Sequence, residues 1–234
     1  MFPAFQNRQP IEKPDYRKDT LDVVRIWRTI QGEGPFAGRP ATFIRLAGCN
    51  LQCRFCDTNY TSPRVSWNLG QVLCSIETVH ARVEEGLVVI TGGEPFRQNI
   101  GPLVAELKRI GHTVQIETNG TLYPGDFPWD AATIVCSPKT GLIASELQPH
   151  IAALKYVLQE GKIDAFDGLP ETTLGQSCRV ARPDRELFKG EIYVQPLDEG
   201  DLDRNVKNLQ AAIGSALQFG HRLCVQVQKI VGLD

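Results

Sequence analysis

The sequence lacks the features that mark several large classes of protein. It contains no uninterrupted apolar run of about 18 residues, the length that a membrane-spanning helix requires. Its formal net charge of -2 gives no positive excess that would attract nucleic acid or anionic lipid. Internal repeats and low-complexity tracts are absent, and the first residues show neither the apolar core nor the cleavage pattern of a secretion signal. We therefore expect a cytoplasmic protein that binds neither nucleic acid nor membranes.

The composition is that of a globular protein with a sizeable core. Of the 234 residues, 42% are hydrophobic and 22% are charged, so a single domain is expected. Residues 1–20 combine three prolines with charges and show no period, which predicts an extended arm before a domain over 21–234. Within that domain, residues 160–190 are broken by glycine and proline, and we interpret them as a variable insertion.

Strand and helix patterns alternate after residue 20. Seven short runs rich in branched residues predict buried strands: DVVRIWRTI, ATFIRLAG, GLVVITGG, HTVQIETNG, ATIVCSP, ALKYVL and EIYVQP. Apolar stripes at helical spacing predict helices between several of them, one with Leu69, Val72, Leu73, Ile76, Val79 and Val83, another with Leu202, Val206, Leu209, Ile213 and Leu217. This alternation is typical of parallel strands joined by crossover helices, in a doubly wound sheet or an α/β barrel.

The faces and ends of the predicted strands indicate where a site would lie. On two strands an apolar face opposes a polar face, which carries Arg45 in one and Glu117 in the other. A half-exposed antiparallel strand would show the same alternation. Several strands end in polar residues, however, as parallel strands do where a site lies at the carboxyl-terminal mouth of a barrel: Thr91, Asn119, Ser137 and Gln195.

The most informative motif is C-x3-C-x2-C, formed by Cys49, Cys53 and Cys56. Three thiolates on one loop can bind three corners of an iron-sulfur cubane and leave one iron open for another ligand. An odd cysteine count with three crowded together favours metal binding in a reducing compartment over a disulfide framework. A zinc site would need a fourth ligand, and none lies nearby at zinc-finger spacing. The other cysteines are expected to be small buried side chains: Cys74, Cys136, Cys178 and Cys224.

This motif, with Phe55 before its last cysteine, resembles that of the radical S-adenosylmethionine (SAM) superfamily. A second match is the strand end VVITGGEP, in which Gly92, Gly93 and Glu94 resemble the superfamily's element for the amino group of SAM. Glycines there allow close backbone approach. The resemblance implies a 4Fe-4S cluster, SAM as cofactor and radical chemistry. The fold that we expect is a partial TIM-type barrel of about six parallel strands with a reduced set of helices.

A narrower resemblance, to the 7-carboxy-7-deazaguanine synthases, covers most of the chain after residue 20. It rests on TIQGEGPFAGRPATFIRLAGCNLQCRFCDT, TGGEP, ETNG, CSPK, YVQPLD and a lysine near the carboxyl terminus. That family rearranges 6-carboxy-5,6,7,8-tetrahydropterin to 7-carboxy-7-deazaguanine with loss of ammonia, in queuosine and deazapurine biosynthesis. The resemblance therefore implies a carbon-nitrogen lyase with a pterin substrate. Two alternatives remain open: a glycyl-radical-enzyme activase, which shares both motifs, and a non-catalytic iron-sulfur or zinc module.

The resemblance also assigns roles to individual residues. Glu117 and Arg45 are implied as catalytic, and a planar guanidinium at Arg45 suits the substrate carboxylate. The residues implied in substrate binding are Ile30, Gln31, Gly32, Glu33, Arg45, Asp57, Thr91 and Glu117. Those implied in SAM binding are Gly92, Gly93, Glu94, Asn119, Ser137, Pro138, Lys139 and Gln195.

Three further partners are implied in the same way. Thr58 matches a threonine that binds Mg2+, although its Asp-Thr-Asn setting is also common in turns. A homodimer and an electron donor such as a flavodoxin or ferredoxin are also implied. The tail departs from the family pattern, because Gln228 precedes Lys229 where the family often has a histidine. No role is therefore carried over to the tail.

Overall fold

One sheet runs through the part of the chain that the computed structural model describes, residues 7–80, 86–172 and 178–233. Its strand order is β3-β1-β2-β4-β5-β6-β7-β8-β9. The strands are β1 (Thr20–Ile30), β2 (Pro40–Leu46), β3 (Val65–Asn68), β4 (Leu87–Gly92), β5 (Thr113–Thr118), β6 (Thr133–Cys136), β7 (Ile151–Leu158), β8 (Glu191–Pro196) and β9 (Arg222–Leu223). The α-helices are α1 (Leu69–His80), α2 (Gly101–Arg109), α3 (Leu202–Phe219) and α4 (Val227–Ile230). Short 3-10 helices are η1 (Gly34–Phe36), η2 (Pro95–Arg97), η3 (Trp129–Ala131) and η4 (Ser145–His150).

The centre of this sheet is parallel. Strands β2, β4, β5, β6, β7 and β8 pair in parallel, each with the next, and the two residues of β9 extend the series. At the other edge β1 is antiparallel to β2, and β3 is antiparallel to β1. The expected partial barrel of about six parallel strands is confirmed. The antiparallel alternative is wrong for β5, since both of its neighbours are parallel to it.

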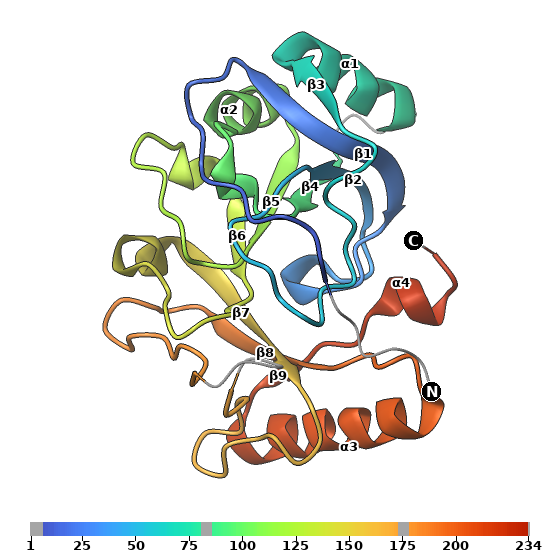
Figure 1. The fold of residues 1–234 in the computed structure, drawn as a ribbon, viewed down its shortest axis with the longest axis vertical. Coiled ribbons are helices and arrows are strands. Elements are labelled where there is room, and N and C mark those ends of the chain that lie inside the picture. Colours follow the sequence, from blue (N-terminus) through green and yellow to red (C-terminus); the bar gives the residue numbers. More distant parts are fainter. Residues whose placement is uncertain (1–6, 81–85, 173–177, 234) are drawn as a thin grey trace.

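The two faces of the sheet have different surroundings. One face packs against α1, α2 and α3, which lie along its outer side (Figure 1). The main core forms there and includes Ile44, Val72, Ile90, Leu103, Ile116, Leu154 and Ala212. Because side chains alternate between the two faces of a strand, the residues between these core positions point to the opposite side. That side carries the polar residues that the site uses.

Helix α1 forms as its apolar stripe predicts. Val72 and Ile76 are buried in the core, and Leu69 and Leu73 pack against it. Val83, the last predicted member of the stripe, lies outside the described residues. The helix therefore covers its end of the sheet with the face that the 3.6-residue period indicates.

The second predicted stripe also forms a helix, α3, but much of that stripe is exposed. Leu202 and Leu217 on α3 are 84% and 83% exposed, whereas Asn208 and Ser215 are buried. Both buried polar side chains are satisfied: Asn208 donates to a backbone carbonyl at 2.9 Å, and Ser215 Oγ donates to the carbonyl of Gly168 at 2.6 Å. Hydrogen bonding removes the cost of burying these groups, so α3 packs through them together with the buried Ala212. Leu209 and Ile213 of the stripe are half-buried, and Leu202, Val206 and Leu217 are exposed.

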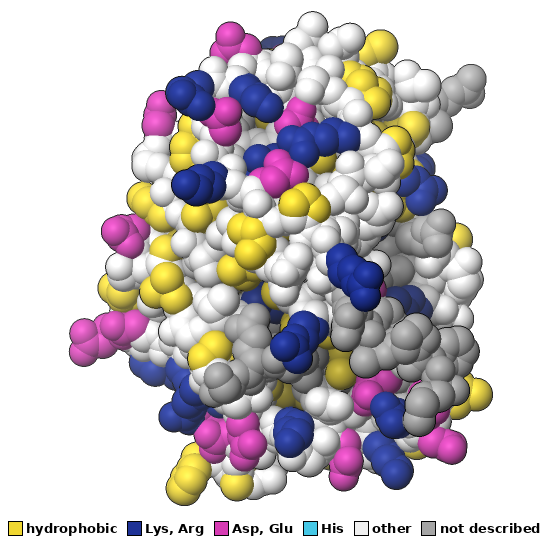
Figure 2. Space-filling model, viewed as in Figure 1, with side chains coloured by type: hydrophobic (Ala, Val, Ile, Leu, Met, Phe, Trp, Pro, Cys, Tyr) yellow, Lys and Arg dark blue, Asp and Glu magenta, His cyan; other side chains and the backbone are white. Residues whose placement is uncertain are grey.

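The molecular surface carries both signs of charge. On the face shown in Figure 2, acidic and basic side chains are interspersed. Among the described residues, no helix is both long and apolar enough to cross a membrane.

Two segments lie outside the regular elements. Residues 7–19 form an extended arm before β1, joined to later parts of the chain by two isolated backbone bridges. The described residues of the predicted insertion, 160–172 and 178–190, likewise contain isolated bridges in place of helices and strands. The arm reaches the functional site, as described below.

Candidate active site

A cavity of about 250 Å³ opens at the carboxyl-terminal ends of the parallel strands. The four polar strand ends singled out from the sequence, Thr91, Asn119, Ser137 and Gln195, all line it. Active sites of parallel barrels lie at this end because the strands stop there together and their following loops converge.

The cluster loop, residues 47–64 between β2 and β3, forms one wall of the cavity. Cys49, Cys53 and Cys56 line it together with Phe55. Cys49 and Cys53 are buried and Cys56 is half-buried. Within the described residues, no group of three or more His, Cys, Asp and Glu side chains could hold a metal ion. A cubane sets a different requirement, since each thiolate binds its own iron at a separate corner, and three thiols on one cavity wall fit that donor set.

Burial affects the ionisation of all three thiols. It raises the pKa of Cys49 to about 12 and also raises the pKa values of Cys53 and Cys56. Coordination to iron deprotonates a thiol outright. Cluster assembly on this loop must therefore release protons, and we expect it to be pH-dependent.

The GGEP turn follows β4 and packs against the start of the cluster loop. Gly92 and Gly93 line the cavity, and Gly92 has a φ of 134°. A Cβ atom on Gly93 would lie 2.1 Å from the carbonyl oxygen of Gly48 and 2.9 Å from Cβ of Cys49. Only glycine allows the two backbones to approach this closely.

Glu94 of the same turn lies behind the cavity wall, with an exposed fraction of 0%. Its carboxylate accepts hydrogen bonds from Phe96 N at 3.0 Å, Asn119 N at 2.7 Å and Thr118 Oγ1 at 2.8 Å. Burial raises the pKa of Glu94 to about 7, although the three hydrogen bonds act to lower it. In this structure Glu94 therefore joins the turn to the end of β5.

The remaining SAM-binding candidates lie on neighbouring strands. Asn119, Ser137, Lys139 and Gln195 line the cavity, while Pro138 lines a smaller adjoining pocket. Lys139 Nζ donates to the carbonyl of Ser137 at 3.0 Å and also to its hydroxyl. Burial lowers the pKa of Lys139. The sequence candidates for SAM are thus close together, with only Glu94 and Pro138 outside the main cavity.

Glu117 is the centre of a hydrogen-bond network on the cavity wall. Its Oε1 accepts from Gln31 Nε2 at 3.0 Å and from Gln115 Nε2 at 3.2 Å. Its Oε2 accepts from Thr91 Oγ1 at 3.0 Å. An ionised carboxylate has about four lone-pair sites, so at least one remains for a further donor.

A buried ion pair forms the neighbouring part of the wall. Glu33 and Lys155 both line the cavity and pair with each other, with side chains only 11% and 13% exposed. Gln226 Nε2 donates to Glu33 Oε1 at 2.7 Å. Burial raises the pKa of Glu33, but the Lys155 ammonium and the hydrogen bonds outweigh it and hold the pKa below its usual value. Burial by itself would lower the pKa of Lys155. The neighbouring Glu33 carboxylate is the main cause acting in the opposite direction, and the pKa of Lys155 lies above its usual value.

Four substrate-binding candidates are not among the residues that line the described cavity: Ile30, Gln31, Gly32 and Arg45. Of these, Gln31 still reaches the wall through its hydrogen bond to Glu117. The Arg45 guanidinium carbon lies 4.9 Å from the ring centroid of Trp27, a cation-π geometry that orients its planar fork. A Cβ on Gly32 would lie 1.4 Å from Gln228 Oε1, so the carboxyl-terminal tail rests directly on this loop.

Asp57 and Thr58 line the cavity where the cluster loop meets the tail. Thr58 Oγ1 donates to Asp57 Oδ1 at 3.4 Å. Lys229 Nζ lies 2.7 Å from Asp198 Oδ2 and 3.7 Å from Asp57 Oδ2. The hydrogen bond from Lys229 is the main cause that lowers the pKa of Asp198 to about 2. The tail lysine therefore joins the loop after β8 to the cluster loop.

Some residues of the site were not predicted. Lys155, Gln226, Tyr60 and Asn7 line the cavity although no motif pointed to them. Lys155 had one available signal, a charge in the middle of the apolar run ALKYVL. The prediction for the scattered cysteines is correct for two and wrong for two: Cys136 and Cys224 are buried, and Cys74 and Cys178 are exposed.

A family model described as the Radical SAM superfamily matches residues 43–129, the segment that holds the cluster loop and the GGEP turn. Fold and site together define a radical SAM enzyme, the class that uses a 4Fe-4S cluster and SAM. Cys49, Cys53 and Cys56 are the residues that would hold the cluster.

Similarity over the whole chain identifies the family within this class. The 7-carboxy-7-deazaguanine synthase of Rhodospirillum rubrum is 43% identical, over 96% of this chain and 97% of that protein. The synthase of Rickettsia prowazekii is 39% identical, over 92% and 89%. The crystal structure of QueE from Escherichia coli superposes with a TM-score of 0.67 at 25% identity, covering 88% of this chain and 94% of that one. The chain belongs to the 7-carboxy-7-deazaguanine synthase family, and neither the activase nor the non-catalytic module describes that family.

Proposed function

We propose that this chain converts 6-carboxy-5,6,7,8-tetrahydropterin to 7-carboxy-7-deazaguanine with release of ammonia, in queuosine biosynthesis. The observation that carries the proposal is that the Glu117 network and the three cluster cysteines face one cavity. When bound, the cluster and SAM supply the deoxyadenosyl radical that takes hydrogen from the substrate. The cavity residues bind the two molecules side by side and orient them.

We assign the cofactor half of the cavity to SAM. Gly92 and Gly93 offer backbone groups at close range, and Ser137, Lys139, Asn119 and Gln195 offer polar side chains on adjacent strands. Ser137 and Lys139 already hydrogen-bond each other, which fixes both before SAM arrives. Fixed donors lose little conformational entropy when a ligand binds.

We assign the other half to the pterin. The unused acceptor capacity of Glu117 suits the N-H groups of an aminopyrimidine, and Gln31 and Thr91 hold the carboxylate in place. Arg45, oriented by Trp27, is the residue we expect to meet the substrate carboxylate. Glu33, kept ionised by Lys155, provides a second acceptor. Glu117 and Arg45 are thus the proposed catalytic residues.

The test is an anaerobic assay of the reconstituted full-length enzyme with reductant, SAM and the carboxylated tetrahydropterin. We expect 7-carboxy-7-deazaguanine and ammonia in equal amounts, with SAM recovered unchanged. Product that still forms at the wild-type rate in Glu117→Ala would remove Glu117 from the mechanism. Absence of product, in protein whose iron and SAM binding are intact, would overturn the proposed reaction.

We propose that Thr58 binds Mg2+, with Asp57 beside it and the substrate carboxylate as a further oxygen ligand. Thr58→Val preserves the shape of the side chain but removes the hydroxyl. We expect the Mg2+ concentration for half-maximal activity to rise about tenfold or more, by analogy with losses around other metal sites. Mg2+ titration of the activity measures this, with Thr78→Val on the exposed face of α1 as control. An unchanged Mg2+ requirement in Thr58→Val would leave Thr58 as a turn residue.

We also propose that the enzyme is a homodimer and that a flavodoxin or ferredoxin reduces its cluster in the cytoplasm. The exposed apolar stripe of α3, which includes Leu202, Val206 and Leu217, supports contact with a second copy. Light scattering of the purified protein measures the oligomeric state directly.

A further inference from the structure

The cluster loop has to hold three iron ligands with little structure of its own. Residues 47–64 form neither helix nor strand. Their internal backbone hydrogen bonds include Gly48 N to Tyr60 O at 2.8 Å and Cys56 N to Cys53 O at 3.2 Å. Ligands of a metal site keep their geometry when neighbouring groups fix them. The neighbour here is the arm of residues 7–19, which runs beside the loop in Figure 1.

Gln9 is the arm residue with the most contacts to the loop. Its Oε1 accepts from Tyr60 N at 2.7 Å and from Thr61 Oγ1 at 3.4 Å. Its Nε2 donates to Thr58 O at 2.8 Å, and its backbone oxygen accepts from Gln52 Nε2 at 2.6 Å. One residue thus contacts the loop on both sides of the second and third cysteines, and the contact at Thr58 lies two residues after Cys56.

The first cysteine is held by the arm backbone. Ile11 pairs with Cys49 in a parallel bridge, and Glu12 N donates to the carbonyl of Cys49 at 2.8 Å. The backbone of an iron ligand is therefore bonded directly to the arm. Asn7 extends the contact further, since its Nδ2 donates to Tyr60 Oη at 3.2 Å on the cavity wall.

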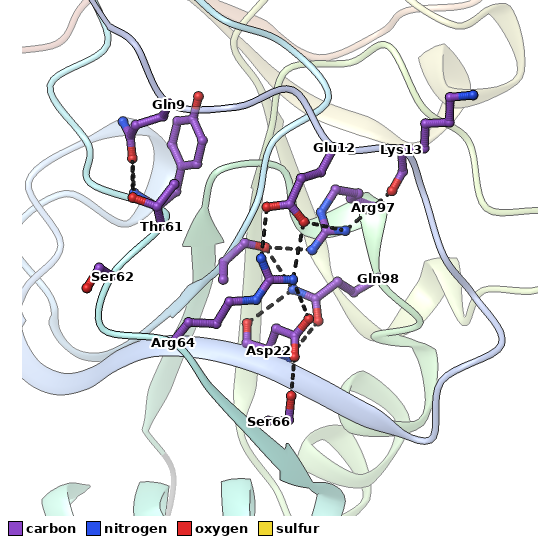
Figure 3. Close-up of polar contacts among 12 residues, drawn as sticks. Gln9, Glu12, Lys13, Asp22, Thr61, Ser62, Arg64, Ser66, Arg97 and Gln98 are labelled. Carbon is purple, nitrogen blue, oxygen red and sulfur yellow. Dashed lines mark hydrogen bonds and ion pairs between the residues drawn. The ribbon is translucent and has the colours of Figure 1, made fainter.

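Glu12 also joins the two ends of the cluster loop. Its carboxylate lies between two arginines in Figure 3, with Arg64 Nη1 at 2.8 Å and Arg97 Nη1 at 3.3 Å. Arg64 belongs to the last residues of the loop, and Arg97 Nη2 donates at 2.9 Å to the carbonyl of Ala47, where the loop starts. Paired guanidinium-carboxylate contacts of this kind fix orientation as well as distance.

We propose that the arm is a brace that holds the cluster loop in its ligand geometry, and that Gln9 is the main positioning residue of this brace. Gln9 is not among the residues that line the cavity, and it acts through Thr58, Tyr60 and Gln52. The prediction concerns retention of the cluster, so it can be tested whatever reaction the enzyme catalyses.

The test compares the rate of cluster loss from Gln9→Leu and from the wild-type enzyme, both full length and reconstituted. An iron chelator is added anaerobically and the visible absorbance of the cluster is followed. Gln9→Leu removes several hydrogen bonds at similar side-chain volume, so we expect loss about tenfold faster. The thermal midpoint of the cluster-free protein should change by less than about 4 °C, because these contacts lie outside the core.

Arg8→Leu is the matched control, since Arg8 is the exposed neighbour of Gln9 on the same arm. Cluster loss at the wild-type rate in Gln9→Leu would overturn the proposal, as would equal acceleration in Arg8→Leu. If Gln9→Leu does not fold, Gln9→Glu decides between the same two outcomes. It keeps the acceptor for Tyr60 N and loses the amide group that donates to Thr58 O on the loop and to Asn7 Oδ1 on the arm, so faster cluster loss supports the brace and the wild-type rate contradicts it.

Discussion

Gly93→Ala is expected to lower the activity about a hundredfold or more and to lower the iron bound per chain. The new Cβ atom would lie 2.1 Å from Gly48 O and 2.5 Å from Gly48 C, both backbone atoms that cannot rotate away. Glu94 N also donates to Gly48 O at 3.0 Å, so this contact joins the GGEP turn to the residue before Cys49. The turn and the cluster loop must separate to admit the methyl group, which displaces Cys49, a proposed cluster ligand, together with the turn that we propose binds SAM.

The measurements are iron per chain after reconstitution and the anaerobic rate of product formation. Gly125→Ala is the control, because Gly125 is exposed and a Cβ there would have no heavy atom within 4 Å. It should retain both properties. Wild-type iron content and activity in Gly93→Ala would show that the loop can move without loss, and the close backbone contact would then have no role in the site.

The sequence located the cavity because its chemistry is carried by local motifs. The spacing of Cys49, Cys53 and Cys56 and the GGEP turn are each set within a few residues, so no tertiary information is needed to find them. Polar residues at the ends of parallel strands converge for a topological reason, and Thr91, Asn119, Ser137 and Gln195 do so here.

The parts that were missed depend on contacts between distant segments. The apolar stripe of α3 predicts the helix but not the two polar residues that it buries, Asn208 and Ser215, whose hydrogen-bond partners lie on loops. Strands β3 and β9 are too short to give a pattern. The arm shows only prolines and charges in sequence, and its order comes from single hydrogen bonds such as those of Gln9. Hydrophobic periodicity does not report contacts of these kinds.

Lys155→Met is expected to lower the free energy of unfolding by about 3–5 kcal/mol at pH 8, the usual effect of removing one partner of a buried ion pair. Lys155 on β7 and Glu33 before η1 are 122 residues apart in sequence, and both side chains are almost fully shielded from water. Methionine fills a similar volume, so the variant removes the charge more than the packing. Glu33 would then be a buried carboxylate without its main cation.

The difference in unfolding free energy between Lys155→Met and the wild-type protein should depend on pH. In the wild-type protein the pKa of Glu33 is lowered, so its contribution is present above the unfolded pKa and is lost as pH falls through the folded pKa. Without Lys155, burial would raise the pKa of Glu33, and the variant would lose stability as pH rises through that raised value. The gap between the two proteins should therefore be wider at pH 8 than at pH 5.5.

Urea unfolding of the cluster-free wild-type and variant proteins at both pH values measures this difference in unfolding free energy. Lys108→Met is the control, because Lys108 is exposed on α2 and its replacement should change stability by no more than about 0.5 kcal/mol. The double variant Lys155→Met/Glu33→Gln removes both charges and retains an acceptor for Gln226, so it should recover most of the lost stability. A deficit that is equal at the two pH values, or a double variant as unstable as Lys155→Met alone, would mean that the loss comes from packing and that Glu33 is not kept ionised by Lys155.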